Sequence, residues 1–135
     1  MFEPAQGRWV NQKIPTKAQV TYTAGMMVYN DATNNVPAVD ATQQNVRGIL
    51  LEAKASSATT TSIHARVPSG TDCTFYADME SGETITKANE GTAFDFATGG
   101  LTVSTASTYD AVTLVKFLTT TSGEFSLNIT TGVEN

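Results

Sequence analysis

The chain has 135 residues, of which 40% are hydrophobic and 16% are charged, and its formal net charge is −5. This length predicts one domain with a core of its own. The negative charge argues against nucleic acid as a direct partner. No apolar run approaches the roughly 20 residues of a membrane-spanning helix. The single cysteine, Cys73, excludes an internal disulfide and a thiolate zinc cage within one chain.

Residues 1–19 are predicted to form an extended N-terminal arm, and residues 20–135 a β domain. Pro4, Gly7 and Pro15 punctuate the arm, and no periodicity runs between them. Its apolar side chains gain little unless something covers them, and Trp is favoured at interfaces. We expect the arm to lie on another subunit or a larger surface, and the β domain to stay folded without it. The alternative is that the Trp side chain folds back onto its own domain on an edge strand. The predicted contact residues are Phe2, Trp9, Val10 and Ile14.

Charge is unevenly distributed along the chain. Residues 1–20 carry three basic residues and one acidic residue, whereas the remainder carries five basic and twelve acidic residues. A mildly basic arm on an acidic body would dock electrostatically on a neighbour, and the other interpretation is chance over a short segment.

Short apolar or alternating runs follow the arm. Residues 26–29 and 36–39 predict a hairpin around a polar turn. Residues 46–53 are the most hydrophobic run and predict a central strand that is buried on both faces or bulged at Gly48. Residues 62–68 alternate most clearly, which is typical of a half-buried strand.

The second half of the chain continues this pattern. Residues 111–118 carry apolar groups on both faces, so we expect a strand that is central or at an interface. A single helical turn is expected near residues 78–81 or 107–110. Further strands are predicted over residues 73–79, 84–86, 93–97, 101–105 and 124–130.

The close spacing of these runs, without any helix-period segment of ten or more residues, predicts an all-β fold. We expect a small antiparallel barrel or sandwich of about 8–10 short strands, with the extended N-terminal arm. Such a domain has exposed sheet edges, which an arm or a partner would cover.

The chemistry-bearing residues do not predict an active site. The alternation places His64 on an outer strand face and Cys73 on the inner face with Phe75, so this pair should not meet as a nucleophile and base. Asp78, Glu80 and Glu83 lie along one turn but lack the ligand spacing of a calcium loop. We therefore expect no enzyme activity, no metal and no cofactor.

Sugar recognition needs only an exposed aromatic ring and a few polar groups. A surface β domain that binds carbohydrate is therefore the alternative function. The candidate aromatic residues are Tyr22, Tyr29, Tyr76 and Tyr109.

Several stretches together resemble tailed-phage capsid decoration proteins, also called cement or head-stabilising proteins. After the Pro-punctuated arm these are AGMMVYN, the apolar run RGIL, SIHARVPSG, GETI and FDFATGG. The resemblance covers most of residues 1–130. It implies a small β-rich domain, often trimeric, on the outside of an icosahedral head, with terminal arms that clip onto capsid subunits. It carries no catalytic residues.

From this resemblance we expect a non-catalytic structural protein of the virion that binds the outer capsid surface and stabilises the lattice. Its partners would be the major capsid protein and further copies of itself, with a homotrimer favoured. Neither nucleic acid nor a membrane is expected as a partner.

Overall fold

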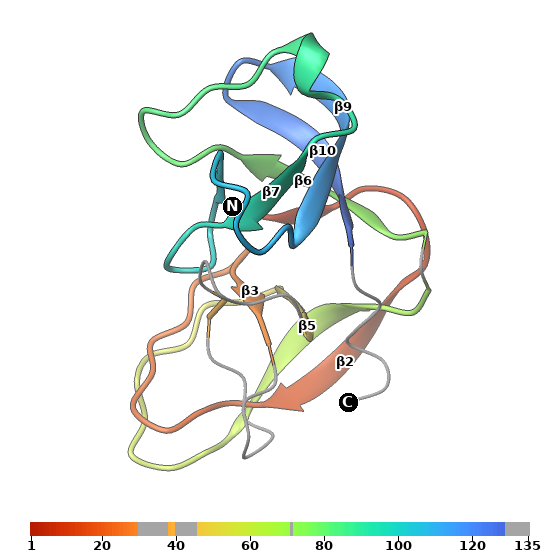
Figure 1. Ribbon diagram of the computed structural model, residues 1–135. Coiled ribbons are helices and arrows are strands. Elements are labelled where there is room, and N and C mark those ends of the chain that lie inside the picture. The colour runs from red at the N-terminus through yellow and green to blue at the C-terminus, as the bar shows by residue number, and fades with distance from the viewer. Residues whose placement is uncertain (30–37, 40–45, 71, 129–135) are drawn as a thin grey trace.

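The computed structural model describes residues 1–29, 38–39, 46–70 and 72–128. These residues form ten strands and one short 3-10 helix, arranged in two antiparallel sheets. The all-β fold and the number of strands confirm the sequence prediction. Figure 1 shows the larger sheet at the top of the molecule, curled around its inner face, and the smaller sheet below it.

The larger sheet has six strands. Its order is β1 (Glu3–Pro4), β6 (Thr74–Asp78), β10 (Ser122–Leu127), β9 (Val112–Thr119), β7 (Ala93–Phe96) and β8 (Val103–Ser104). The 3-10 helix η1 (Lys87–Asn89) lies in the connection between β6 and β7. The smaller sheet has four strands, in the order β2 (Trp9–Pro15), β5 (Ser62–Pro68), β4 (Gly48–Leu50) and β3 (Met27–Val28).

The smaller sheet is packed on both faces. On β4, Ile49 enters a core shared with the larger sheet, whereas the next residue, Leu50, enters a second core on the opposite face. This confirms that the run over residues 46–53 contains a central strand buried on both faces, at Gly48–Leu50, whereas residues 51–53 are exposed. Gly48 permits the close packing, because a Cβ at this position would lie 2.7 Å from the carbonyl oxygen of Arg66.

The shared core contains a cluster of phenylalanine rings. The ring centroids of Phe2 and Phe96 are 5.8 Å apart, and those of Phe75 and Phe125 are 6.1 Å apart. Phe94 meets Phe125 edge to face at 6.4 Å. These rings come from β6, β7, β10 and the residue before β1, so the cluster joins the start of the chain to its second half.

The prediction of a separate N-terminal arm over residues 1–19 is wrong, because strands within the first 15 residues pair with both sheets. β1 pairs with β6, and β2 pairs with β5 over all seven of its residues. Gly7 makes the turn between them with φ of +82°, where a Cβ would lie 2.7 Å from the Cα of Cys73. The alternative interpretation, an edge strand on the chain's own domain, is the observed one.

Most other strand predictions agree with the structure. β5 has the predicted bounds, and the run over residues 73–79 buries Cys73, Phe75, Ala77 and Met79 on one face as predicted. The prediction of a strand over residues 84–86 is wrong. The helical turn lies at Lys87–Asn89 rather than near residues 78–81 or 107–110. Of the predicted hairpin, only residues 26–29 and 38–39 are described, and Val28 bridges Ala38 there. The end of the strand predicted over residues 124–130 also lies outside the described residues.

Candidate docking surface

The four predicted contact residues do not form one exposed surface. Phe2 is 2% exposed and Ile14 is fully buried, so neither is available to a partner in this conformation. Phe2 and Trp9 pack in the shared core, and Val10 and Ile14 pack in the second core. The indole N–H of Trp9 donates to the carbonyl oxygens of Gln6 at 3.0 Å and Thr74 at 3.2 Å. The chain itself therefore covers the apolar side chains that were expected to need a partner.

Large apolar side chains are instead exposed on β9. The pairing of β9 with β10 shifts twice, so that Val115 and Leu118 have no partner residue on β10. Each shift is a β-bulge, which places an extra residue in one strand and turns side chains out of the regular alternation. Val115 is 47% exposed and Leu118 is 41% exposed. The sequence predicted a strand here that is central or at an interface, and β9 is central, because it lies between β10 and β7.

A third exposed side chain, Tyr76, lies across the same sheet. Glu124 of β10 is opposite both Tyr76 of β6 and Lys116 of β9, so the three residues form one row on one face. Tyr76 is 40% exposed. Two strand spacings separate Tyr76 from Lys116, which is about 10 Å. Tyr76, Val115 and Leu118 define the surface that we name the β9 surface.

The row between these residues is polar and held in place. Glu124 is buried, and its Oε2 accepts a hydrogen bond of 2.7 Å from the hydroxyl of Thr74. A buried carboxylate needs such a donor, because an unpaired one would lose its hydration without compensation. The hydrogen bond joins β6 to β10 in the middle of the β9 surface.

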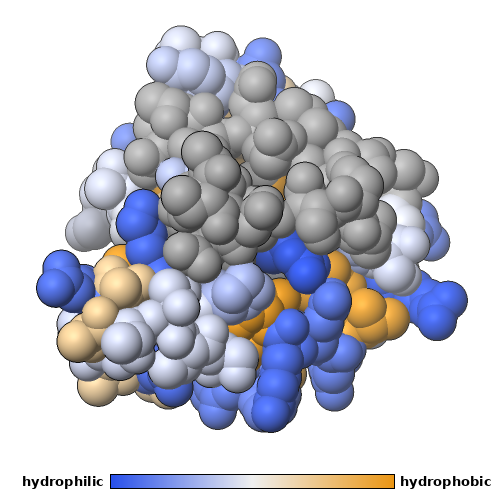
Figure 2. All heavy atoms as spheres, turned by 90° about the horizontal axis from the view of Figure 1, so that it is seen from below, coloured by the Kyte–Doolittle hydropathy of each residue, from blue (hydrophilic) through white to orange (hydrophobic). Residues whose placement is uncertain are grey.

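At the opposite end of the molecule, the described surface is mainly hydrophilic. Figure 2 views the molecule from the side of the smaller sheet, where hydrophobic atoms are exposed only in areas interrupted by hydrophilic side chains. Outside the larger sheet, one exposed apolar side chain is Leu51, which directly follows β4 and is 45% exposed. Leu51 has about the same exposure as Val115 and therefore offers a matched comparison with the β9 surface.

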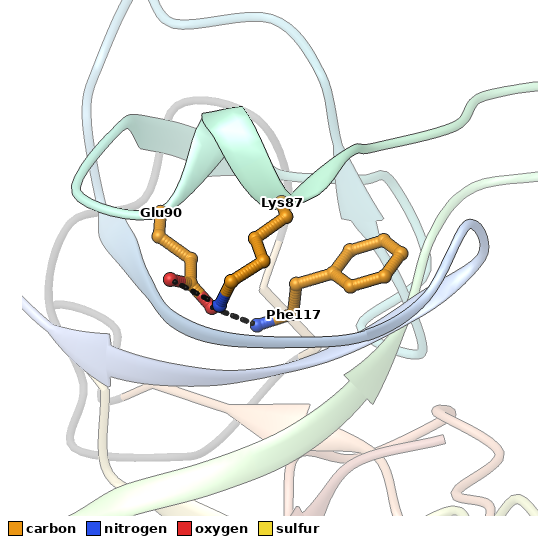
Figure 3. A network of polar contacts seen from close by, with 3 residues as sticks. All are labelled: Lys87, Glu90 and Phe117. Atoms are coloured by element: carbon orange, nitrogen blue, oxygen red, sulfur yellow. Dashed lines mark hydrogen bonds and ion pairs between the residues drawn. The ribbon is translucent and has the colours of Figure 1, made fainter.

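A carboxylate network caps the edge of β9 beyond the end of β7. Glu90 Oε2 accepts a hydrogen bond of 2.8 Å from the N–H of Phe117, and the Lys87 ammonium lies 3.2 Å from Glu90 Oε1 (Figure 3). These contacts lower the pKa of the Glu90 carboxyl, the backbone hydrogen bond from Phe117 contributing most. The charged cap occupies an N–H that an added strand would otherwise use.

Asp95 anchors the loop before β9. Asp95 lies between Phe94 and Phe96, and strict alternation would point it outward, but it is 1% exposed. Its carboxylate accepts three backbone hydrogen bonds, from Thr108 at 3.1 Å and from Tyr109 and Asp110 at 2.8 Å each. Three successive N–H groups bound to one carboxylate hold the loop against β7. The role of Asp95 is therefore structural.

His64 and Cys73 have different partners, as the sequence predicted. His64 Nδ1 lies 2.8 Å from Glu52 Oε2, which also accepts the backbone N–H of His64 at 2.9 Å. These bonds lower the pKa of the Glu52 carboxyl, the backbone one contributing most. The buried thiol of Cys73 donates to the carbonyl oxygen of Arg8 at 3.0 Å. The two side chains thus lie in separate hydrogen-bonded pairs.

The acidic turn after β6 is divided among separate contacts. Asp78 Oδ2 binds the N-terminal ammonium group of Met1 at 3.1 Å, and Glu83 Oε1 accepts the N–H of Thr105 at 2.6 Å. Among the described residues, no group of three or more His, Cys, Asp or Glu side chains could hold a metal ion.

The four tyrosines do not form one aromatic site. Tyr22 is buried in the second core, where its hydroxyl accepts the N–H of Lys17 at 2.7 Å, and Tyr29 packs against the shared core. Only Tyr76 and Tyr109 are exposed, on β6 and in the loop that Asp95 anchors.

In the described ranges, no helix has the length and hydrophobicity of a membrane span. A scan against protein-family models finds no match to this sequence, and a search of curated proteins also finds none.

Proposed function

We propose that this protein is a non-catalytic structural protein that binds the outer surface of an icosahedral phage head and stabilises its lattice. The single observation that carries the proposal is the β9 surface, where Tyr76 on β6 and Val115 and Leu118 on β9 are exposed on one sheet, with β10 between the two strands. The sequence resemblance to capsid decoration proteins names the partner, which is the major capsid protein.

The β9 surface has the composition of an interface core. Aromatic and large aliphatic residues dominate the buried centres of protein interfaces, and charged residues surround them. Single exposed apolar residues are common on any protein. Here, however, two of the three are bulge residues on one strand, and β10 with its buried Glu124 lies between that strand and Tyr76. The backbone of β9 is hydrogen-bonded to β10 on one side and to β7 on the other, so little conformational entropy is lost on binding.

The docking mode differs from the one expected from the sequence. Residues 1–15 are part of the folded domain. The proposed capsid contact is therefore a sheet face rather than an N-terminal arm. A single contact of this size is modest, but a head presents many equivalent sites, and symmetry multiplies the gain for the shell.

The experiment first searches the genes adjacent to this one for a major capsid gene and then measures co-sedimentation with expanded heads assembled from its product. The Val115→Ser/Leu118→Ser double variant should bind at least about 30-fold more weakly, because two apolar interface residues are lost. Leu51→Ser is the matched control and should bind like the wild type, because Leu51 lies on the smaller sheet. Both variants should unfold at the wild-type denaturant midpoint.

Wild-type binding by the double variant would contradict the proposed surface. Failure of the unaltered protein to bind these heads, or the lack of a capsid gene nearby, would contradict the proposed function itself.

A further inference from the structure

The two sheets carry opposite charge. The smaller sheet and its loops, over residues 5–29, 38–39 and 46–70, have six basic side chains and one acidic side chain. The larger sheet and its loops, over residues 1–4 and 72–128, have two basic and nine acidic side chains. The six basic residues are Arg8, Lys13, Lys17, Arg47, Lys54 and Arg66. This division of charge does not follow the order of the chain, because β1 and its acidic Glu3 come first in the sequence but belong to the larger sheet.

Figure 1 shows the two sheets at opposite ends of the molecule. Among the described residues, the net positive charge and the net negative charge therefore lie at opposite ends of the molecule. A two-fold contact between identical ends would bring like charges together, whereas a head-to-tail contact brings opposite charges together. We propose that copies of this chain associate head to tail, with the basic β2 edge of one copy on the acidic turn after β6 of the next.

The basic contact surface is the outer edge of β2. Two bonds fix which peptide groups of β2 face β5: Ser69 N–H donates to Arg8 O, and Thr16 N–H donates to Thr61 O, both at 3.0 Å. Even-numbered residues of β2 thus bind β5, and the peptide groups of Trp9, Asn11 and Lys13 point outward. No other strand of the described residues pairs with this edge.

Lys13 gives this edge its specificity. Its side chain is exposed and has no partner within the described ranges. A lysine on an open strand edge opposes pairing with an identical edge, because two such cations would lie close together. The same lysine favours an acidic surface. The β2 edge is therefore suited to a different part of a second copy rather than to itself.

The acidic contact surface is the turn that follows β6. Asp78 and Glu80 are exposed there, and Glu83 is half-buried. Asp78 is already paired with the N-terminal ammonium group, and Glu83 binds the N–H of Thr105. The Glu80 side chain has no partner in the part of the chain that the structure describes. With respect to the described residues, Lys13 on β2 and Glu80 in the turn after β6 are thus exposed ions of opposite sign without a partner.

The association does not depend on head binding, so it can be tested with the full chain alone. Sedimentation velocity at about 0.02 M and about 0.5 M salt should show association that salt weakens, because screening shortens the reach of surface charges. Lys13→Glu and Glu80→Lys should each weaken association at low salt at least about tenfold. Lys54→Glu makes the same change in net charge outside β2, at the residue that bridges Tyr22, and should have little effect.

Mixing the two variants is the decisive step. In an equimolar mixture, the glutamate introduced by Lys13→Glu in one chain faces the lysine introduced by Glu80→Lys in the other. The remaining contact keeps the natural Lys13 and Glu80, so association should return. A two-fold contact through β2 would not respond to Glu80→Lys. A wild-type chain that stays monomeric at low salt, or single variants that the mixture does not rescue, would overturn the proposal. Circular dichroism of each variant confirms that loss of association is not loss of folding.

Discussion

Phe2 and Phe75 meet edge to face, with their ring centroids 5.5 Å apart. The backbone N–H of Phe2 also donates to the carbonyl oxygen of Gly25 at 2.8 Å, just before β3 of the smaller sheet. Phe2 therefore contacts the larger sheet through its ring and the smaller sheet through its backbone. The start of the chain connects the two sheets, and this is why it is unavailable as a docking arm.

Replacing Phe2 with alanine should destabilise the fold by about 3–5 kcal/mol, the cost of removing a buried phenylalanine from a packed core. Equilibrium urea denaturation followed by circular dichroism measures this change. Leu51→Ala, at an exposed site, should change the free energy of unfolding by no more than about 0.5 kcal/mol. Similar effects at the two positions would contradict the assigned place of Phe2 in the core.

Deleting residues 1–15 should abolish the folded state rather than leave a stable body. The deletion removes an edge strand from each sheet and takes Phe2, Trp9 and Ile14 out of the two cores. The loss exceeds the roughly 5–15 kcal/mol that typically separates folded from unfolded domains. Dispersed amide proton resonances from the truncated chain would show that the first 15 residues are dispensable after all.

Replacing Asp95 with alanine should cost about 3 kcal/mol, because three backbone N–H groups lose a charged acceptor in a buried place. Amide hydrogen exchange at Thr108, Tyr109 and Asp110 should accelerate in the variant. Asp110→Asn is a suitable control, since asparagine tolerates the positive φ of 54° at that position. Unchanged exchange at the three amides would rule out Asp95 as the anchor of the loop.

Stability should fall on acidification below about pH 4.3, the ordinary pKa of a glutamate. The pKa values of Glu52 and Glu90 are lowered in the folded chain, so folding favours their ionised forms. Their contribution is complete above the unfolded pKa and is lost as the pH falls through the folded one. Urea midpoints between about pH 2.5 and 6 measure the slope, and the Glu52→Gln/Glu90→Gln variant should show a shallower one. An identical slope would mean that other carboxyl groups determine the acid response.

Trp9 is the only tryptophan of the chain, and its indole N–H binds Thr74 across the two sheets. Its fluorescence therefore reports on the contact between the sheets, while far-ultraviolet circular dichroism reports on the strands. The two unfolding curves should coincide, because the shared core makes unfolding cooperative. Trp9→Phe should lower the free energy of unfolding by about 1 kcal/mol through loss of the indole hydrogen bond. Separate midpoints would show that the sheets unfold independently.

Sequence alternation predicted the strands whose two faces differ most. In β5, Ile63, Ala65 and Val67 are buried as the alternation requires. The same reasoning failed for residues 1–15, because their partners lie far along the chain. Glu3 pairs with Tyr76, and Trp9 pairs with Pro68. Local periodicity does not contain such pairings, and Pro and Gly at the strand ends resembled the punctuation of an unpaired arm.

The alternation of apolar and polar residues also could not predict the candidate docking surface. Val115 and Leu118 are exposed because of bulges, which insert a residue and break the period of two. Alternation alone would place Asp95 outside, because it lies between Phe94 and Phe96, yet the loop over residues 105–110 covers it. The polar composition of that loop was visible in the sequence, but the carboxylate that orders its N–H groups was not.

The central claim is that a rigid sheet face, and not the N-terminal segment, contacts the capsid. Oxidative footprinting of the protein bound to expanded heads tests this most directly, because it reports the solvent access of individual side chains. We predict that binding strongly reduces oxidation of Tyr76 and Leu118, while that of Leu51 stays unchanged. Protection confined to residues 1–15, or equal oxidation of Tyr76 and Leu118 in the free and bound protein, would contradict the account.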